Sequence, residues 1–216
     1  MMPVCCDPSD YGGVFDEREA RHSLRRFRKR GLDSTAGPMI GALARRGLHG
    51  ATVTEAGAGI GSAQVALLAS GAERGVAYEL SPGYELVAAE LLADHGMTDR
   101  VEWRTANFVT ASGHETSDVV FLNRVVCCYP DMPAMVDRAS QGAGRFLAMS
   151  YPRQRLLVRI GTRGVNAFLW LRRTTFRAFV HDPKAIGQRI TGAGFTEVES
   201  GRTAVWEWKV WERNSN

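Results

Sequence analysis

A glycine-rich segment that follows an acidic residue is the feature of the sequence that most directly suggests a chemistry. Glu55 precedes the run GAGIG at 57–61, and a second acid, Glu79, ends the next apolar stretch. Glycines permit a tight turn between a strand and a helix, and they let the backbone approach a flat ligand closely. The dinucleotide fingerprint GxGxxG would need a glycine where this chain has Ser62. Because an acid at the strand end repels a pyrophosphate, the segment instead predicts a site for a cationic ammonium or sulfonium ligand.

The elements that must position these acids alternate between strands and helices. Short apolar runs predict strands at 51–55, 75–80, 100–105, 118–122 and 145–150. Helical patterns precede, separate or follow them at 16–31, 34–47, 62–70, 81–94, 133–140, 154–173 and 183–193. Such alternation implies right-handed crossovers and a mainly parallel sheet with helices on both faces. Near the end of the chain, runs at 197–200 and 204–211 flank Gly201-Arg202-Thr203 and predict an antiparallel hairpin.

With this loop and this strand order, the chain resembles the class I S-adenosylmethionine-dependent methyltransferases. The family's ExGxGxG loop matches 55–61, its ribose-binding acid matches Glu79, and the resemblance covers about 51–151 and the terminal hairpin in outline. It implies a Rossmann-like α/β fold, with a seven-stranded, mostly parallel sheet that has a terminal antiparallel strand. It also implies an enzyme that uses S-adenosylmethionine to methylate oxygen or nitrogen of a small organic acceptor, in bacterial specialised metabolism. Within the family, the chain is distantly similar to magnesium-protoporphyrin O-methyltransferase.

The resemblance also implies which residues hold the cofactor. They are Tyr11, Glu55, Gly57, Ala58, Gly59, Gly61, Glu79, Leu80, Asn107, Phe108, Asn123 and Arg124. The glycine loop and Glu55 would hold the methionine part, Glu79 the ribose, and Asn107 with Phe108 the adenine. Asn107 departs from the aspartate that is usual there. We expect one domain over 1–216, with a helical leader or lid at 1–50, a core at 51–216 and a substrate insert at about 151–182.

Three residues are candidates for catalysis. Cys127 and Cys128 lie after the fourth predicted strand, where a thiolate could take a proton, bind a soft metal or form a covalent intermediate. The alternative is a buried apolar filler, a role that free cysteine often has. His181 precedes a predicted helix and titrates near neutrality, so it is either a general base, a helix cap or a solvated residue.

The substrate is expected to contact Tyr129, Tyr151 and Arg153. Arginines that follow the fifth predicted strand could bind a carboxylate or phosphate of an anionic substrate through paired hydrogen bonds. A solvated helix face is the alternative for these arginines.

Composition narrows the class of protein. The chain has 216 residues, of which 44% are apolar and 23% charged, with a net charge of +4, as in a globular protein that has a sizeable core. The cysteines form two adjacent pairs, Cys5-Cys6 and Cys127-Cys128, which fit neither a zinc motif nor a simple disulfide framework. We therefore expect a reduced, cytoplasmic protein without a metal, although convergence of all four cysteines on a soft metal is an alternative.

Partners other than a small molecule have less support. No apolar run reaches the roughly 20 residues of a membrane span, so we expect no membrane partner. The basic segment Arg18–Arg30 could bind RNA or an acidic surface, but no aromatic platform accompanies it, so we interpret it as a solvated face. An RNA methyltransferase and a nonenzymatic S-adenosylmethionine-binding protein are the alternatives to the small-molecule enzyme. Trp206, Trp208 and Trp211 in the last predicted strand favour packing in the core and at an interface over a ligand cage, and the strand is also a candidate edge for a homodimer.

Overall fold

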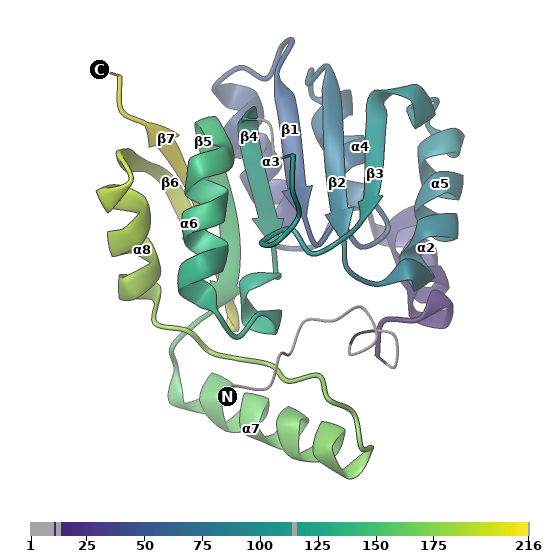
Figure 1. Cartoon of the computed structure of the whole chain (residues 1–216), viewed down its shortest axis with the longest axis vertical. Coiled ribbons are helices and arrows are strands. Elements are labelled where there is room, and N and C mark those ends of the chain that lie inside the picture. The colour runs from purple at the N-terminus through teal and green to yellow at the C-terminus, as the bar shows by residue number, and fades with distance from the viewer. Residues whose placement is uncertain (1–10, 12–13, 114–115, 216) are drawn as a thin grey trace.

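A twisted seven-stranded sheet forms the centre of the computed structural model, which describes residues 11, 14–113 and 116–215 (Figure 1). The strands are β1 (Thr52–Ala56), β2 (Arg74–Glu79), β3 (Val101–Thr105), β4 (Ser117–Asn123), β5 (Ala143–Pro152), β6 (Phe195–Arg202) and β7 (Trp206–Arg213). Their order is β3-β2-β1-β4-β5-β7-β6, and β7 runs antiparallel to β5 and β6 whereas the other neighbouring pairs are parallel. The predicted fold class is confirmed, including the antiparallel terminal strand.

Helices cover both faces of this sheet. They are α2 (Glu17–Arg30), α3 (Ala36–Arg45), α4 (Ser62–Ala69), α5 (Glu85–Asp94), α6 (Met132–Gly142) and α8 (Pro183–Gly192). A further helix, α7 (Leu156–Leu171), lies off the faces of the sheet (Figure 1). Short 3-10 turns lie at η1 (Pro82–Tyr84), η2 (Thr98–Arg100) and η3 (Val126–Cys128). The alternation of β4 divides the core, since Val119 and Phe121 pack with α2 to α5 and Val120 and Leu122 pack with α6 and α8.

The leader helix α2 begins where its sequence predicts. Asp16 is the N-cap, and its carboxylate accepts a hydrogen bond from the Glu19 backbone N–H at 2.9 Å. Two arginines of α2 form ion pairs with an acid of α5. Arg28 lies 2.9 Å from Glu90, and Arg21 also pairs with Glu90. Acidic side chains of α5 therefore neutralise part of the positive charge of the basic segment.

The terminal hairpin differs from the prediction in the position of its turn. Gly201 and Arg202 lie within β6, and the chain reverses between Thr203 and Trp206, whose backbone oxygen accepts from the Thr203 N–H at 2.7 Å. A Cβ at position 201 would come within 2.5 Å of the Trp208 ring, so this glycine permits the indole to pack across the strand. Gly201 therefore marks a close contact between the β6 backbone and the Trp208 ring, and not a turn.

The predicted dimer edge is also wrong. β7 lies between β5 and β6, so its backbone hydrogen bonds are made within the sheet. In the sheet that the structure describes, the edge strands are β3 and β6.

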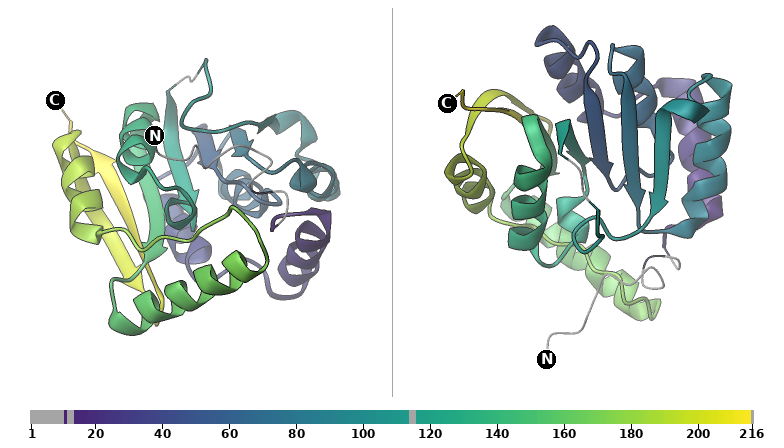
Figure 2. Two further views of the ribbon diagram at one scale, coloured as in Figure 1. Left: turned by 60° about the horizontal axis from the view of Figure 1, so that its bottom comes forward. Right: turned by 45° about the horizontal axis from the view of Figure 1, so that its top comes forward.

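α7 lies away from the sheet, across the end at which the strands approach the candidate site (Figures 1 and 2). It belongs to the segment at about 151–182 that is predicted to be a substrate insert. No helix among the described residues is long and apolar enough to cross a membrane.

Candidate functional site

An open cavity with about 740 Å³ of empty space lies at the carboxyl ends of β1, β2 and β4. This is where the strand order reverses between β1 and β4, the position at which open α/β sheets bind ligands. The lining residues are Tyr11, Phe15, Ala56, Gly57, Gly59, Tyr78, Glu79, Leu80, Tyr84, Ala106, Asn107, Phe108, Asn123, Arg124, Val125, Cys128, Tyr129 and Met135.

The glycine loop forms one wall of the cavity by close approach of the backbone. Gly57, Gly59 and Gly61 have φ values of 64°, 56° and 76°, a left-handed conformation that glycine adopts without strain. A Cβ on Gly57 would lie 2.5 Å from the Val125 side chain. The loop therefore requires glycine at position 57 for space as well as for conformation.

Two buried acids lie beneath this loop. Glu79 accepts hydrogen bonds from the backbone N–H groups of Gly59 at 2.8 Å and Ser81 at 2.9 Å, and burial raises the pKa of its carboxyl. Glu55 is 3% exposed, and among the described residues its Oε2 atom has no hydrogen-bond partner. Burial and then the charge of Glu79 raise the pKa of Glu55 well above its ordinary value. Two carboxyl groups this close to each other favour a cationic ligand.

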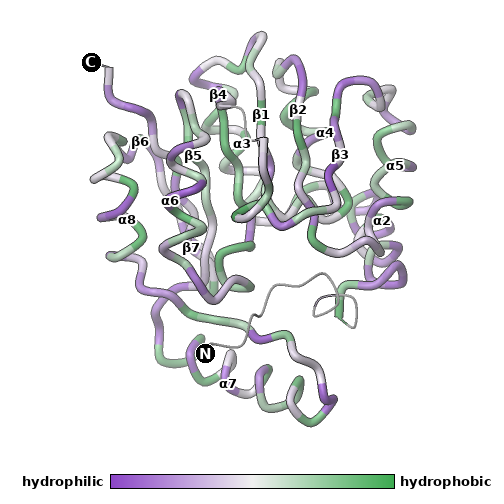
Figure 3. The backbone as a smooth tube through the Cα atoms, in the orientation of Figure 1, coloured by the Kyte–Doolittle hydropathy of each residue, from purple (hydrophilic) through white to green (hydrophobic). Residues whose placement is uncertain are grey.

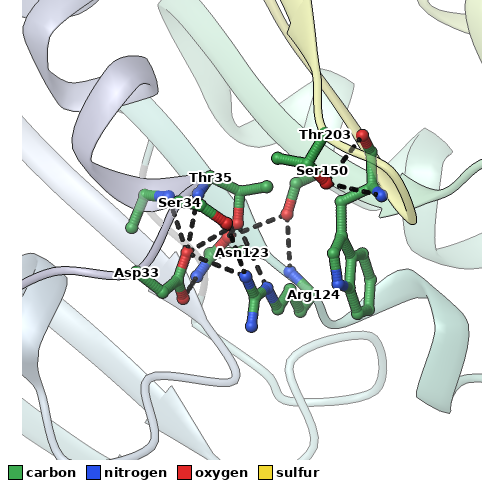
Figure 4. Close-up of polar contacts among 9 residues, drawn as sticks. Asp33, Ser34, Thr35, Asn123, Arg124, Ser150 and Thr203 are labelled. Atoms are coloured by element: carbon green, nitrogen blue, oxygen red, sulfur yellow. Dashed lines mark hydrogen bonds and ion pairs between the residues drawn. The ribbon is translucent and has the colours of Figure 1, made fainter. Parts of the chain in front are cut away.

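A polar network fixes the end of β4 against the start of α3 (Figure 4). Asn123 donates to Asp33 at 2.8 Å, and the Thr35 and Ser150 hydroxyls lie 2.7 Å and 2.8 Å from its Oδ1. The Ser150 hydroxyl also accepts from the Arg124 backbone N–H at 2.9 Å. These bonds hold the polypeptide where it turns over the glycine loop.

Arg124 is held in the same network by its backbone and by its charge. Its φ of 60° is left-handed, which is uncommon for a residue with a Cβ. Its guanidinium lies 3.3 Å from Asp33 and 4.8 Å from the Trp206 ring centre. Burial raises the pKa of Asp33, but hydrogen bonds from Ala36 and Thr35 and the charge of Arg124 outweigh it, so the pKa is lowered.

Tyr11 and Phe15 line another side of the cavity, and side chains from a distant segment pack behind them. The Tyr11 hydroxyl donates to the Cys128 carbonyl oxygen at 2.7 Å. The Phe176 ring packs edge-on against Tyr11 at 5.5 Å and against Phe15 at 5.2 Å between ring centres. Leu169 of α7 packs in the same cluster. Residues that precede α2 thus pack against residues of α7 and of the segment that follows it, beside the cavity.

The cysteines and His181 occupy different positions relative to this cavity. Cys128 lines it and Cys127 does not, and their sulfur atoms are 3.6 Å apart. A hydrogen bond with Cys127, followed by burial, raises the pKa of the Cys128 thiol well above its ordinary value. Cys5 and Cys6 lie outside the described residues. Nothing in this arrangement favours a thiolate at neutral pH.

His181 lies outside the cavity lining. Its Nε2 is 2.9 Å from the Tyr129 carbonyl oxygen, and burial lowers the pKa of the imidazole. The Phe179 N–H also donates to the Cys127 carbonyl oxygen at 2.7 Å. These bonds join the segment that precedes α8 to the η3 turn and the residue after it. His181 thus has a structural contact, which gives no support to its use as a general base.

The structure brings most of the other predicted site residues together. All the predicted cofactor residues line the cavity except Glu55, Ala58 and Gly61, which lie just behind it in the strand and loop. Tyr129 also lines it. Tyr151 does not, because it is buried within β5, and Arg153 instead donates to the Thr203 carbonyl oxygen at 2.9 Å. In the described part of the chain, no group of three His, Cys, Asp or Glu residues could hold a metal.

Several residues of the site were missed by reasoning from the sequence. Tyr84 lines the cavity from the turn after β2, and Asp33, Thr35 and Ser150 form the supporting network. The only local signal was the Asp33-Ser34-Thr35 helix start, which gave no indication of a contact with Asn123.

Comparisons with known proteins agree with this architecture. No protein-family model matches the sequence, and a comparison with curated proteins gives no significant match. Solved structures do match. Magnesium protoporphyrin IX methyltransferase from Synechocystis PCC 6803, with bound SAH, has a TM-score of 0.71 at 19% identity and covers 96% of this chain and 100% of its own. An O-methyltransferase family 2 protein from Planctomyces limnophilus, in complex with apigenin, has a TM-score of 0.67 at 18% identity over 92% of this chain and 62% of its own.

A third match shows how widely this architecture is shared. A putative RNA methyltransferase from Pyrococcus horikoshii has a TM-score of 0.56 at 14% identity, over 82% of this chain and 83% of its own. At such identities the similarity establishes the fold and leaves the acceptor open. The chain has the Rossmann-like fold of the class I S-adenosylmethionine-dependent methyltransferases.

Proposed function

We propose that this chain is an S-adenosylmethionine-dependent methyltransferase that acts on oxygen or nitrogen of a small organic acceptor. The observation that carries the proposal is the pair of buried acids beneath a glycine loop, at the carboxyl end of the sheet. The matching structures include one methyltransferase solved with SAH and with SAM. When bound, the cofactor supplies a methyl group on a positively charged sulfur, which a nucleophile displaces in line.

The residues present fit such a cofactor. Glu79 uses each carboxylate oxygen for one backbone N–H, and each oxygen retains a free lone pair that can accept a ribose hydroxyl. The unpartnered Glu55 oxygen and the raised pKa of both carboxyls favour a ligand that brings positive charge. Asn107 and Phe108 line the cavity beside the end of β3, on the side proposed for the adenine.

The contribution of the protein to the reaction would be alignment and exclusion of water. The Asn123 network would fix one side of the cavity, and the Tyr11 and Phe15 rings, which Phe176 supports, would exclude water on another. The Cys128 thiol is held protonated, and His181 is bound to a backbone carbonyl. We therefore propose an acceptor that arrives already deprotonated or is a neutral amine, so that it needs no base from the protein.

An anionic acceptor is part of the proposal. Arg124 supplies positive charge in the described cavity lining, although Asp33 shares that charge. We also propose that the chain forms one methyltransferase domain, with residues 1–50 as its lid and about 151–182 as its substrate insert. Bacterial specialised metabolism is the setting that we propose for it.

Turnover is the experiment that tests the proposed activity. The protein is incubated with S-adenosylmethionine and a small-molecule extract of its source, and we expect S-adenosylhomocysteine to form while one compound gains the mass of a methyl group. Glu79→Ala should abolish both signals. Glu73 is exposed and directly precedes β2, at the end of the strand opposite Glu79, so Glu73→Ala should retain both signals. Cofactor binding without turnover in any extract would favour a nonenzymatic binding protein, and methylation of RNA with salt-sensitive RNA binding would favour the RNA enzyme.

A further inference from the structure

α7 carries a row of large apolar side chains that face solvent. Leu157 is 81% exposed and Leu171 is 71% exposed. Others on the helix that are more than half exposed are Leu156, Ile160, Val165, Phe168 and Trp170. Away from α7, Leu86 and Val205 are the other large apolar residues with exposed side chains among the described residues. The exposed apolar surface is thus concentrated on one helix.

The orientation of α7 is fixed by contacts on its opposite side. Asn166 donates to the Ala178 carbonyl oxygen and accepts from the Ala178 N–H, both at 2.8 Å. Leu169 is the buried residue of the helix. At about 100° per residue, Leu157, Ile160 and Leu171 fall on the side away from Leu169. A surface helix normally turns its apolar face towards the core, whereas this helix presents its apolar face to the exterior.

The charged side chains of α7 and of the segments that flank it in sequence are all basic. No aspartate or glutamate occurs between Asp137 and Asp182. The arginines in and beside the helix are Arg153, Arg155, Arg159, Arg163, Arg172 and Arg173. None of them forms an ion pair within the part of the chain that the structure describes, whereas Arg21 and Arg28 of α2 pair with acids of α5. Figure 3 shows apolar and polar residues interspersed along α7.

We propose that α7 lies on the surface of an anionic lipid bilayer, with its apolar face among the upper acyl chains and its arginines at the phosphates. Exposed Leu, Phe and Trp residues beside arginines are the composition of helices that lie in this interface. The absence of acids from the segment favours a uniformly anionic surface as the occupant, because each arginine there finds a phosphate. The 16 residues of α7 are too few to span a bilayer. The sequence-based expectation of no membrane partner rested on the lack of a span, and a helix on the surface needs none.

Docking of α7 brings the candidate site to the membrane. Leu169 packs with Phe176 and Tyr11, and Tyr11 lines the cavity. The same segment returns to the η3 turn through the bond from Phe179 to Cys127. The cavity therefore lies directly behind the docked helix.

Vesicle binding by the full chain tests this proposal. The protein is sedimented with vesicles of phosphatidylcholine, and with vesicles to which anionic phosphatidylglycerol has been added. We expect binding to the anionic vesicles that weakens as salt is raised. Replacing both Leu157→Glu and Leu171→Glu should weaken it by about tenfold or more. Leu86→Glu, a comparably exposed leucine of α5, is the matched control and should bind like the wild type.

The charge is tested in the same way. Arg159→Ala with Arg163→Ala removes two charges from α7, and Arg25→Ala with Arg26→Ala removes two from exposed positions of α2. We expect only the α7 pair to lose affinity for anionic vesicles. Circular dichroism should show that all variants fold, because every substituted side chain is exposed.

Three results would overturn the proposal. One is that the wild type does not bind anionic vesicles. Another is that the α7 variants bind like their matched controls. The third is a concentration-dependent dimer, seen by analytical ultracentrifugation without vesicle binding, that the Leu157→Glu and Leu171→Glu substitutions abolish. Vesicle binding needs no cofactor, so these outcomes are independent of the proposed methyl transfer.

Discussion

The two sides of the cavity are built in different ways. On the floor, Glu79 is fixed by the backbone N–H groups of Gly59 and Ser81, and Asn123 by a partly buried polar network. On the roof, Tyr11 and Phe176 meet through ring contacts and one side-chain hydrogen bond to the Cys128 carbonyl oxygen. The floor depends on the fold itself, whereas the roof depends on side chains that segments far apart in the sequence bring together. This difference suits a floor that binds the cofactor and a roof that selects the acceptor.

The largest expected effect is on the floor. Glu79→Ala removes a buried carboxylate and leaves the Gly59 and Ser81 N–H groups without it, so we expect affinity for S-adenosylmethionine to fall by about 100-fold or more. Glu79→Gln retains a hydrogen-bond acceptor but not the charge, so its affinity for S-adenosylmethionine should lie between those of the wild type and Glu79→Ala. Calorimetry measures both, with Glu73→Ala as the control. If Glu79→Ala bound S-adenosylmethionine with wild-type affinity, the Glu79 carboxylate would not be part of the cofactor site.

The glycine loop allows a test of space against backbone strain. Gly57→Ala combines a φ of 64° with a Cβ only 2.5 Å from Val125, and we expect it to lower the free energy of unfolding by about 2–4 kcal/mol. Gly96→Ala is the matched control, because it has the same φ of 64° and no atom within 4 Å of the new Cβ. It should cost about 1 kcal/mol. If urea unfolding gave the same decrease in the free energy of unfolding for both variants, the Val125 side chain would move aside at little cost, and the close contact with Gly57 would not contribute to stability.

The acids of the floor predict a pH dependence. Burial raises the pKa of both Glu55 and Glu79, so a larger fraction of each is protonated at mildly acidic pH than in an ordinary glutamate. A cationic ligand binds the ionised form better, so affinity for S-adenosylmethionine should rise with pH and binding should release protons. Calorimetry in buffers of different ionisation enthalpy measures the protons. S-adenosylhomocysteine lacks the sulfonium charge and should show a smaller slope. Identical slopes for the two ligands would argue against the acids as partners of the sulfonium.

The roof should affect the acceptor more than the cofactor. Phe176→Ala opens the contact with Tyr11 and Phe15, so we expect KM for the acceptor to rise by about tenfold while cofactor affinity changes by no more than about threefold. Steady-state kinetics with calorimetry separates the two. A loss of cofactor affinity as large as that of Glu79→Ala would contradict the division between floor and roof.

His181 should have the smallest effect, and on stability. Burial lowers its pKa in the folded state, so below about pH 6.5 the unfolded chain binds the proton more readily. The free energy of unfolding should therefore decrease as pH falls through this range, and less steeply in His181→Gln. Urea unfolding at several pH values measures the slope, and turnover at saturating substrate should stay within about threefold of wild type. A large loss of turnover with an unchanged stability slope would instead make His181 a general base.

The features of the fold and of the candidate site that can be predicted from sequence are those encoded locally. The glycine loop follows β1 and Glu79 ends β2, each within one short segment, and both reach the cavity; the alternation of strands and helices gives the fold class, which is confirmed. The Thr35 contact with Asn123 joins residues 88 positions apart, so no local pattern reports it. His181 has a backbone carbonyl as its partner, which a sequence does not display. The sequence predicts a turn at Gly201, because a glycine that makes room for a tryptophan looks the same in sequence as a glycine at a turn.

The most direct test of the central claim is calorimetric titration of the purified chain with S-adenosylmethionine and with S-adenosylhomocysteine. The buried acids, the glycine loop and the open cavity predict saturable binding of both ligands at one site per chain, lost in Glu79→Ala and retained in Glu73→Ala. Absence of binding by either ligand to folded protein would contradict the proposed cofactor and, with it, the proposed methyl transfer.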